Sequence, residues 1–263
     1  MPGLGPQESM PFIGCNLPES EAGYPKLPND IFEDLDAVSV SRQALYSFLS
    51  RVFERELTVD IIGELQGSSD AIGKLAPLRG LGNRKLNEGL DLLESFLKTS
   101  RSEPNEEVQK RLAAEFAGLF RGGSQKATRP SESSYLAGRR SAKPLDQITT
   151  MYKSVGLDKA PTFDEPDDHI AIELQFMSYL AGETAAAAKS RDQARAAELL
   201  RLQNRFLRNH LYRWVGLLAA DLNTNAKSQL YGGAGLVAAG FVEEDVKTVD
   251  DFIEDIAPSS KAS

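Results

Sequence analysis

The densest group of side chains that could do chemistry lies between Asp164 and Glu173, where acidic residues, a proline and a histidine stand close together. Glu165, His169 and Glu173 follow one another at intervals of four, so on a helix they would share one face. Carboxylates and an imidazole could bind a metal, but a carboxylate-bridged di-iron bundle needs Glu-x-x-His motifs on two helices. Here the spacing is Glu-x-x-x-His and occurs once, and two histidines and one cysteine serve zinc poorly. We therefore expect no metal site and no cofactor.

The sequence does not support nucleophilic catalysis either. The single cysteine, Cys15, lies in a Pro- and Gly-rich N-terminal stretch, and no Gly-x-Ser-x-Gly elbow is present. No phosphate-binding loop and no Gly-x-Gly-x-x-Gly motif follow a strand pattern. The sequence therefore favours a binding protein over an enzyme.

Composition and charge narrow the class of partner. Of the 263 residues, 41% are hydrophobic and 26% charged, which is typical of a globular protein with a sizeable core. No segment approaches the roughly 20 apolar residues of a membrane helix, so no stable membrane insertion is expected. The formal charge of −8 disfavours nucleic acid and favours a basic peptide or protein surface. One cysteine and no secretory signal fit a cytoplasmic protein.

The 164–173 stretch also has the features of a helix start. Pro166 suits the first helical position, and the acidic residues around it favour the positive end of a helix dipole. Ile170, Leu174 and Met177 then repeat with a helical period. A cap needs one polar residue, so the excess of acid and histidine indicates a recognition edge as well.

The rest of the chain predicts an all-α fold of about ten helices without a significant β-sheet. We expect a mobile extension over 1–35, a single helical domain over 36–256 and a disordered tail over 257–263. Within the domain, 36–160 would form an N-terminal part, 161–169 a hinge and 170–256 a C-terminal helix group. Apolar periodicity predicts helices over 39–53, 58–67, 86–97, 104–120, 142–155, 166–190, 191–222 and 228–240. The irregular stretch 122–136 is long enough to be functional, and the acidic stretch 243–255 is predicted to be a solvated face or a frayed end.

Several motifs in order resemble those of one family. Glu165-Pro166-x-Asp168-His169-Ile170, followed by Glu173-Leu174-x-Phe176-Met177, is similar to the Glu-Pro-x-Asp-His signature of the TorD/DmsD-type chaperones of molybdoenzymes. Four further segments match the family pattern, namely Glu115-Phe116-x-x-Leu119-Phe120, Pro130-Ser131-Glu132-Ser133-Ser134-Tyr135, Tyr152-x-x-x-Gly156-Leu157 and Phe206-x-x-x-His210-Leu211-x-x-Trp214. The second of these departs from the pattern at Ser131, where the family has an aromatic residue. The resemblance covers most of the predicted domain but not the N-terminal extension.

The resemblance implies an all-helical cytoplasmic chaperone that is not an enzyme. Such a protein binds the twin-arginine signal peptide, the apo form, or both, of a molybdopterin oxidoreductase catalytic subunit, assists cofactor insertion and prevents premature export. It would be a monomer or a homodimer. A peptide with paired arginines beside an apolar segment needs carboxylates next to an apolar groove. The residues expected to bind it are Glu132, Tyr135, Glu165, Pro166, Asp168, His169 and Glu173.

Two alternatives stay open. One is an assembly chaperone of the nitrate-reductase type, whose client subunit is not exported or stays in a membrane complex. The other, less favoured, is an enzyme or a nucleotide-binding switch.

Overall fold

The computed structural model describes residues 30–67, 73–122, 128–136, 144–161 and 163–256. These residues form α1 (Ile31–Glu54), α2 (Val59–Gly67), α3 (Arg84–Ser100), α4 (Asn105–Phe116), α5 (Glu132–Leu136), α6 (Pro144–Ser154), α7 (Ile170–Lys189), α8 (Gln193–Phe206), α9 (Tyr212–Asn225) and α10 (Gln229–Ile256). A 3-10 helix, η1 (Gly73–Leu81), precedes α3, and two π-helical turns, η2 (Ala117–Arg121) and η3 (Leu207–Leu211), follow α4 and α8. In this part of the chain the β pairing is limited to one isolated bridge, between Ser131 and His169. The all-α prediction is confirmed.

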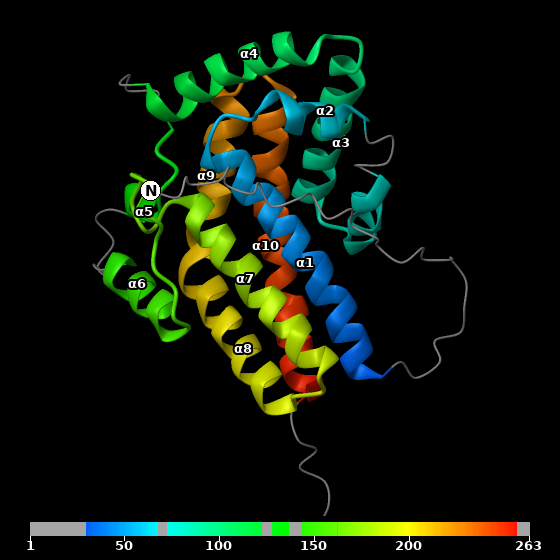
Figure 1. Cartoon of the computed structure of the whole chain (residues 1–263), viewed down its shortest axis with the longest axis vertical. Coiled ribbons are helices and arrows are strands. Elements are labelled where there is room, and N and C mark those ends of the chain that lie inside the picture. Colours follow the sequence, from blue (N-terminus) through cyan, green and yellow to red (C-terminus); the bar gives the residue numbers. More distant parts are fainter. Residues whose placement is uncertain (1–29, 68–72, 123–127, 137–143, 162, 257–263) are drawn as a thin grey trace, which may run out of the picture.

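The longest helices lie side by side along the long axis of the molecule, with α1 along α7, and α10 along α3, α8 and α9 (Figure 1). One continuous apolar cluster joins side chains from α1 to α10, so both predicted parts of the domain contribute to the same core. The leucines that predicted α3, Leu86, Leu90, Leu93 and Leu97, are all buried in it. None of the described helices is both long and apolar enough to cross a membrane. The hinge at 161–169 stays a prediction.

The C-terminal helix is much longer than the sequence suggested. We expected it to end near Gly240, which was wrong because α10 continues to Ile256, so the acidic stretch 243–255 is helical and not frayed. Six of its seven acidic side chains are at least partly exposed, as expected of a solvated face. Val246 and Val249 extend its buried stripe, and Asp245 is only 1% exposed. Two of the glycines that weakened the prediction of its first half lie at close helix contacts: a Cβ at Gly233 would lie 3.0 Å from the Gly89 oxygen of α3, and a Cβ at Gly235 would lie 2.9 Å from the Leu222 side chain of α9.

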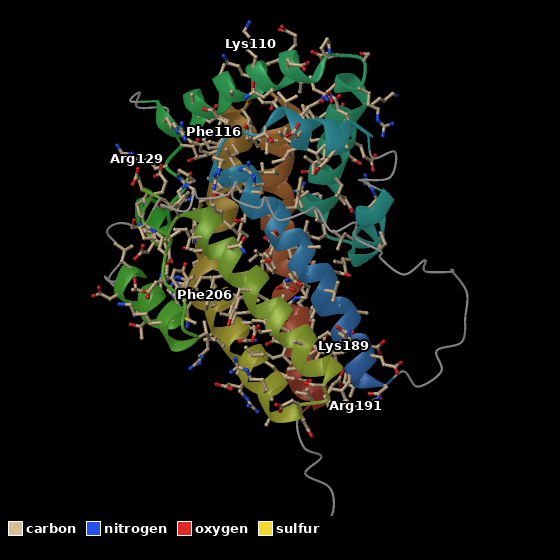
Figure 2. All side chains as sticks on the ribbon, viewed as in Figure 1. Lys110, Phe116, Arg129, Lys189, Arg191 and Phe206 are labelled. Atoms are coloured by element: carbon tan, nitrogen blue, oxygen red, sulfur yellow. The ribbon has the colours of Figure 1, made fainter. Side chains whose placement is uncertain are left out.

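The first helix begins earlier than expected, at Ile31. The Asp30 carboxylate caps it by accepting a hydrogen bond from the Phe32 amide at 3.0 Å, and Leu35 is already fully buried. Arg191, in the turn between α7 and α8, forms an ion pair with Asp30 and lies over the Phe32 ring (Figure 2). The last residues of the predicted extension, 31–35, therefore belong to the bundle, whereas 1–29 and the tail 257–263 lie outside the described residues.

Candidate functional site

Two segments that are distant in sequence meet at the candidate site: the α5 segment (130–136) and the signature turn (163–170). The Glu132 amide donates to the Asp168 carbonyl at 3.0 Å, and the Ile170 amide donates to the Pro130 carbonyl at 2.8 Å. Asp168 Oδ2 accepts a further hydrogen bond from the Ser133 amide at 2.7 Å, inside the first turn of α5. Asp168 therefore acts as a cap for α5 and fixes the two segments to each other.

His169 is the N-cap of α7, so the predicted helix start at Pro166 was wrong by four residues. Its backbone is extended (φ −71°, ψ 138°), and its Nδ1 accepts a hydrogen bond from the Ala171 amide at 3.2 Å. Burial lowers the pKa of His169 to about 4, so the imidazole is neutral near pH 7 and Nδ1 is free to accept. Pro166 lies in the preceding turn, where its carbonyl accepts from the His169 amide at 3.0 Å.

Three carboxyl side chains, those of Glu132, Asp168 and Glu173, are 0% exposed at this site. Glu132 Oε2 lies 2.8 Å from His210 Nδ1, which ties α5 to the π-helical turn η3. Glu173 Oε2 accepts a hydrogen bond from Trp214 Nε1 of α9 at 3.1 Å. The sequence predicted that these three residues bind a ligand, and the structure places their side chains inside the protein.

The environment of Glu173 favours its protonated form. Burial is the main cause and raises its pKa well above the ordinary value; the negative charges of Glu132 and Asp168 act in the same direction, and the Trp214 hydrogen bond opposes them.

In the described residues, no group of three or more His, Cys, Asp or Glu side chains has a geometry that could hold a metal ion.

The outer edge of the site carries the side chains that solvent reaches. Glu165 and Pro166 are exposed, and Lys159 Nζ holds the turn by donating to the Glu165 carbonyl at 2.6 Å. Tyr135 is half-buried: its ring stacks on Trp214 with centroids 5.6 Å apart, and its hydroxyl donates to Asp221 Oδ2 at 2.8 Å. Asp221 was missed from the sequence because it follows the apolar stripe of α9 without a motif of its own.

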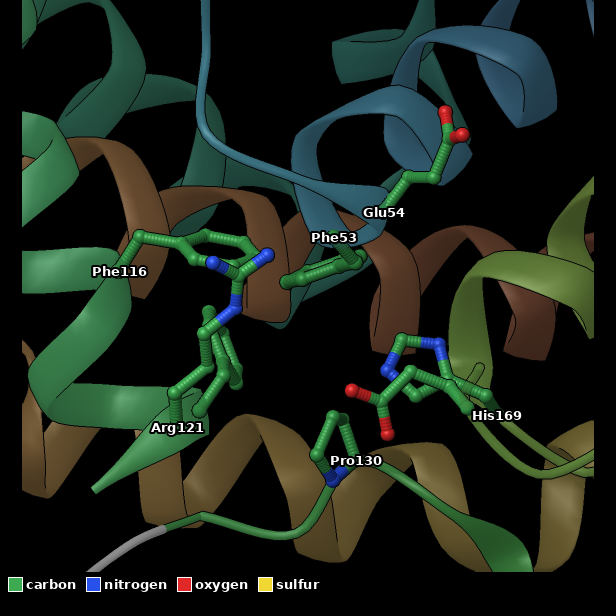
Figure 3. Close-up of a pocket in the computed structure, with 8 residues that line it drawn as sticks. Phe53, Glu54, Phe116, Arg121, Pro130 and His169 are labelled. Carbon is green, nitrogen blue, oxygen red and sulfur yellow. The ribbon is translucent and has the colours of Figure 1, made fainter. Parts of the chain in front are cut away.

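A small hollow of about 20 Å³ opens beside the signature turn, between the end of α1, η2 and the α5 segment. Figure 3 shows Phe53 and Glu54 on one side of it, Phe116 and Arg121 on another, and Pro130 and His169 on a third. This volume holds about one water molecule. The hollow is therefore shallow, and its lining combines the carboxylates of Glu54 and Glu165 and the guanidinium of Arg121 with aromatic side chains.

The seven predicted site residues thus differ in their exposure to solvent. Glu165 and Pro166 are exposed, Tyr135 is half-buried, and Glu132, Asp168, His169 and Glu173 are buried. All seven belong to the two joined segments or to the first turn of α7. Whether they bind a ligand stays a prediction.

Comparison with known proteins gives relatives over nearly the whole chain. The chaperone protein TorD of Vibrio cholerae serotype O1 (strain M66-2) is 25% identical over 228 residues, which cover 86% of this chain and 99% of that protein. The protein of the same name from Psychrobacter sp. (strain PRwf-1) is 28% identical over 221 residues, 83% of this chain and 96% of that protein. No solved structure gives a significant match. The family model described as nitrate reductase delta subunit matches residues 83–220, from the N-cap of α3 to the middle of α9. Since this match spans more than half of the chain, the protein belongs to the nitrate reductase delta subunit family.

Proposed function

We propose that this protein is a cytoplasmic chaperone for the maturation of a molybdoenzyme, and not an enzyme itself. It would bind the twin-arginine signal peptide, the apo form, or both, of a molybdopterin oxidoreductase catalytic subunit until the cofactor is inserted. The observation that carries this proposal is the similarity to TorD chaperones over 86% of the chain and 99% of the relative. The residues of the signature, on which the resemblance rests, lie together at one site.

The surface of the site supports binding of a basic peptide. Exposed Glu165 can accept a two-point hydrogen bond from a guanidinium group, and Asp164 beside it is exposed as well. Tyr135 and Pro166 add apolar area at the same edge, which suits the apolar segment that follows the arginines in such a signal peptide. The net charge of −8 favours the approach of a cationic partner.

The burial of the seven predicted site residues suggests which of them contact the peptide and which support the site. We propose that Glu165, Pro166 and Tyr135 contact the peptide directly. Glu132, Asp168, His169 and Glu173 would then act by holding the α5 segment and the signature turn in place, since their side chains are covered by the protein itself.

Isothermal titration with the cognate twin-arginine signal peptide tests this proposal. Glu165→Gln should weaken binding about tenfold, since a charge-assisted hydrogen bond contributes about 1.5–3 kcal/mol. Glu64→Gln, at an exposed position of α2 outside the site, is the matched control and should bind like the unmodified protein. Binding should also weaken as salt is added. Equal affinities for the two variants, or affinity indifferent to salt, would contradict the assignment of the acidic edge.

A second candidate function is favoured by the family description. A nitrate reductase delta subunit type of chaperone assembles a subunit that is not exported or that stays in a membrane complex. Identification of the bound client by mass spectrometry after a pull-down distinguishes the two, because a client with a twin-arginine motif near its N-terminus supports the first function and a client without one supports the second.

A further inference from the structure

The three buried carboxyl groups of the site share a feature that the proposed function does not explain. Each has one oxygen with a hydrogen-bond partner and a second oxygen with none: Glu132 Oε1, Asp168 Oδ1 and Glu173 Oε1. An ionised carboxylate oxygen can only accept hydrogen bonds, and leaving one buried without a donor is costly. A proton held by one of the three carboxyl groups would provide the donor that these oxygens lack.

Among the described residues, the groups that face the cluster do not include an unpaired cation. The α5 segment contributes Glu132, the signature turn Asp168, α6 Tyr152, η3 His210 and α9 Trp214, and the pKa of Tyr152 is raised by burial and then by the charges of this same cluster. On the neighbouring α1, the arginines have acidic partners of their own, Asp245 for Arg42 and Glu54 for Arg51. An ionised Glu173 would therefore add a buried negative charge without a cation to compensate it.

We propose that Glu132, Asp168 and Glu173 share one proton, carried by Glu173, and that this proton holds the α5 segment and the signature turn closed against α7 and α9. Trp214 already donates to Glu173 Oε2, which leaves Oε1 to carry the hydrogen. The protonated Oε1 then donates to Glu132 Oε1 or Asp168 Oδ1, so a single proton satisfies two of the three unpartnered oxygens and removes one negative charge. When the proton leaves to solvent, three carboxylates face one another and the two segments loosen.

The consequence for the client rests on the proposed function. A guanidinium group arriving at the signature turn lowers the pKa of nearby carboxyl groups, so peptide binding should release the shared proton. Affinity should accordingly rise with pH over the range in which the free protein still holds that proton. The site would in this way be closed when empty and opened by a cationic partner.

The free protein provides the decisive test. The folded-state pKa of Glu173 lies above its unfolded value of about 4.3, so its contribution to stability is complete below that value and is lost as pH rises toward the folded-state pKa. In this window the unfolding equilibrium constant should increase by up to about tenfold for each pH unit. Glu173→Gln carries a permanent N–H donor in place of the proton and should lack this increase. Glu183→Gln, on the same helix but partly exposed, should keep it.

Infrared spectroscopy observes the proton without any substitution. The unmodified protein should show a protonated carboxyl band at a pH above the ordinary titration range of glutamate, this band should disappear as the pH is raised further, and Glu173→Gln should lack it. Absence of the band in the unmodified protein, or the same pH dependence of unfolding in Glu173→Gln and the unmodified protein, overturns the shared proton.

The link between the shared proton and client binding is tested separately. The protein is titrated calorimetrically with the signal peptide in two buffers that have different ionisation enthalpies, which measures the number of protons released on binding. Release of about one proton is expected, and it should be absent in Glu173→Gln. Binding without proton release would refute the link while leaving the chaperone function in place. If the peptide does not bind at all, the proposed peptide-binding edge fails, and the unfolding and infrared results still decide on the proton.

Discussion

Arg42 of α1 and Asp245 of α10, which are 203 positions apart in the chain, form a two-point ion pair inside the bundle. Arg42 Nε lies 2.5 Å from Asp245 Oδ1 and its Nη2 lies 2.9 Å from Oδ2, and the two side chains are 3% and 1% exposed. Tyr46 donates its hydroxyl to the same carboxylate at 2.6 Å, and Arg42 also donates to Gln203 of α8. This network joins α1, α8 and α10 where water does not reach.

Removing the Asp245 carboxylate should therefore strongly destabilise the fold. Asp245→Ala leaves the Arg42 guanidinium buried without its counter-ion, and we expect a loss of about 3–5 kcal/mol in the free energy of unfolding, measured with urea. Adding Arg42→Met should recover part of that loss because the unpaired charge is gone. Lys247→Ala breaks an ion pair with Glu244 on the same helix in which the lysine is exposed, and it should cost far less. A loss for Asp245→Ala as small as that for Lys247→Ala would show that the buried pair does not stabilise the bundle.

The His169 cap should make the protein less stable in acid. Its folded-state pKa is about 4 whereas the unfolded value is about 6.5. The unfolded chain therefore binds more protons between these values, and stability should fall as pH drops through this window, by up to about 3 kcal/mol. In a His169→Asn variant the new side chain can still cap the helix but does not titrate. The free energy of unfolding of this variant should therefore fall less in acid than that of the unmodified protein. Parallel pH profiles for the two proteins would show that His169 does not cause the acid sensitivity.

Much of the fold could be predicted because helical periodicity is a local property of the chain. The α3 leucines and the α7 stripe from Ile170 were predicted correctly for this reason. The end of α10 could not be predicted, since Asp245 looks like a solvated acid until Arg42, far away in sequence, is placed against it. At the candidate site the motif located the turn but not its burial, because Asp168 is covered by the amide of Ser133, which lies 35 positions earlier.

The close approach of α3 and α10 should make Gly89 intolerant of a side chain. A Cβ atom at Gly89 would lie 2.7 Å from the Val237 nitrogen and 2.8 Å from the Gly233 oxygen, both of which are backbone atoms that cannot rotate away. Gly89→Ala should therefore reduce the free energy of unfolding by about 1–3 kcal/mol despite the better helix propensity of alanine. Gly216→Ala in α9 is the matched control, because a Cβ there meets nothing within 4 Å and should stabilise by about 0.5–1 kcal/mol. Equal effects at the two positions would mean that α3 and α10 can move apart freely.

Glu115 of α4 should stabilise the start of α10 from outside that helix. Its Oε1 accepts hydrogen bonds from the backbone amides of Lys227 at 2.7 Å and Ser228 at 2.8 Å, immediately before α10 begins. Amides at a helix start lack partners within the helix, and a carboxylate there also interacts favourably with the helix dipole. Glu115→Ala should cost about 1–3 kcal/mol and speed hydrogen exchange at these two amides, whereas Glu115→Gln, which keeps an acceptor oxygen, should cost less. Glu107→Ala, at an exposed position of the same helix, serves as the control and should leave both amides protected. If exchange at Lys227 and Ser228 is unchanged in Glu115→Ala, the carboxylate does not cap α10.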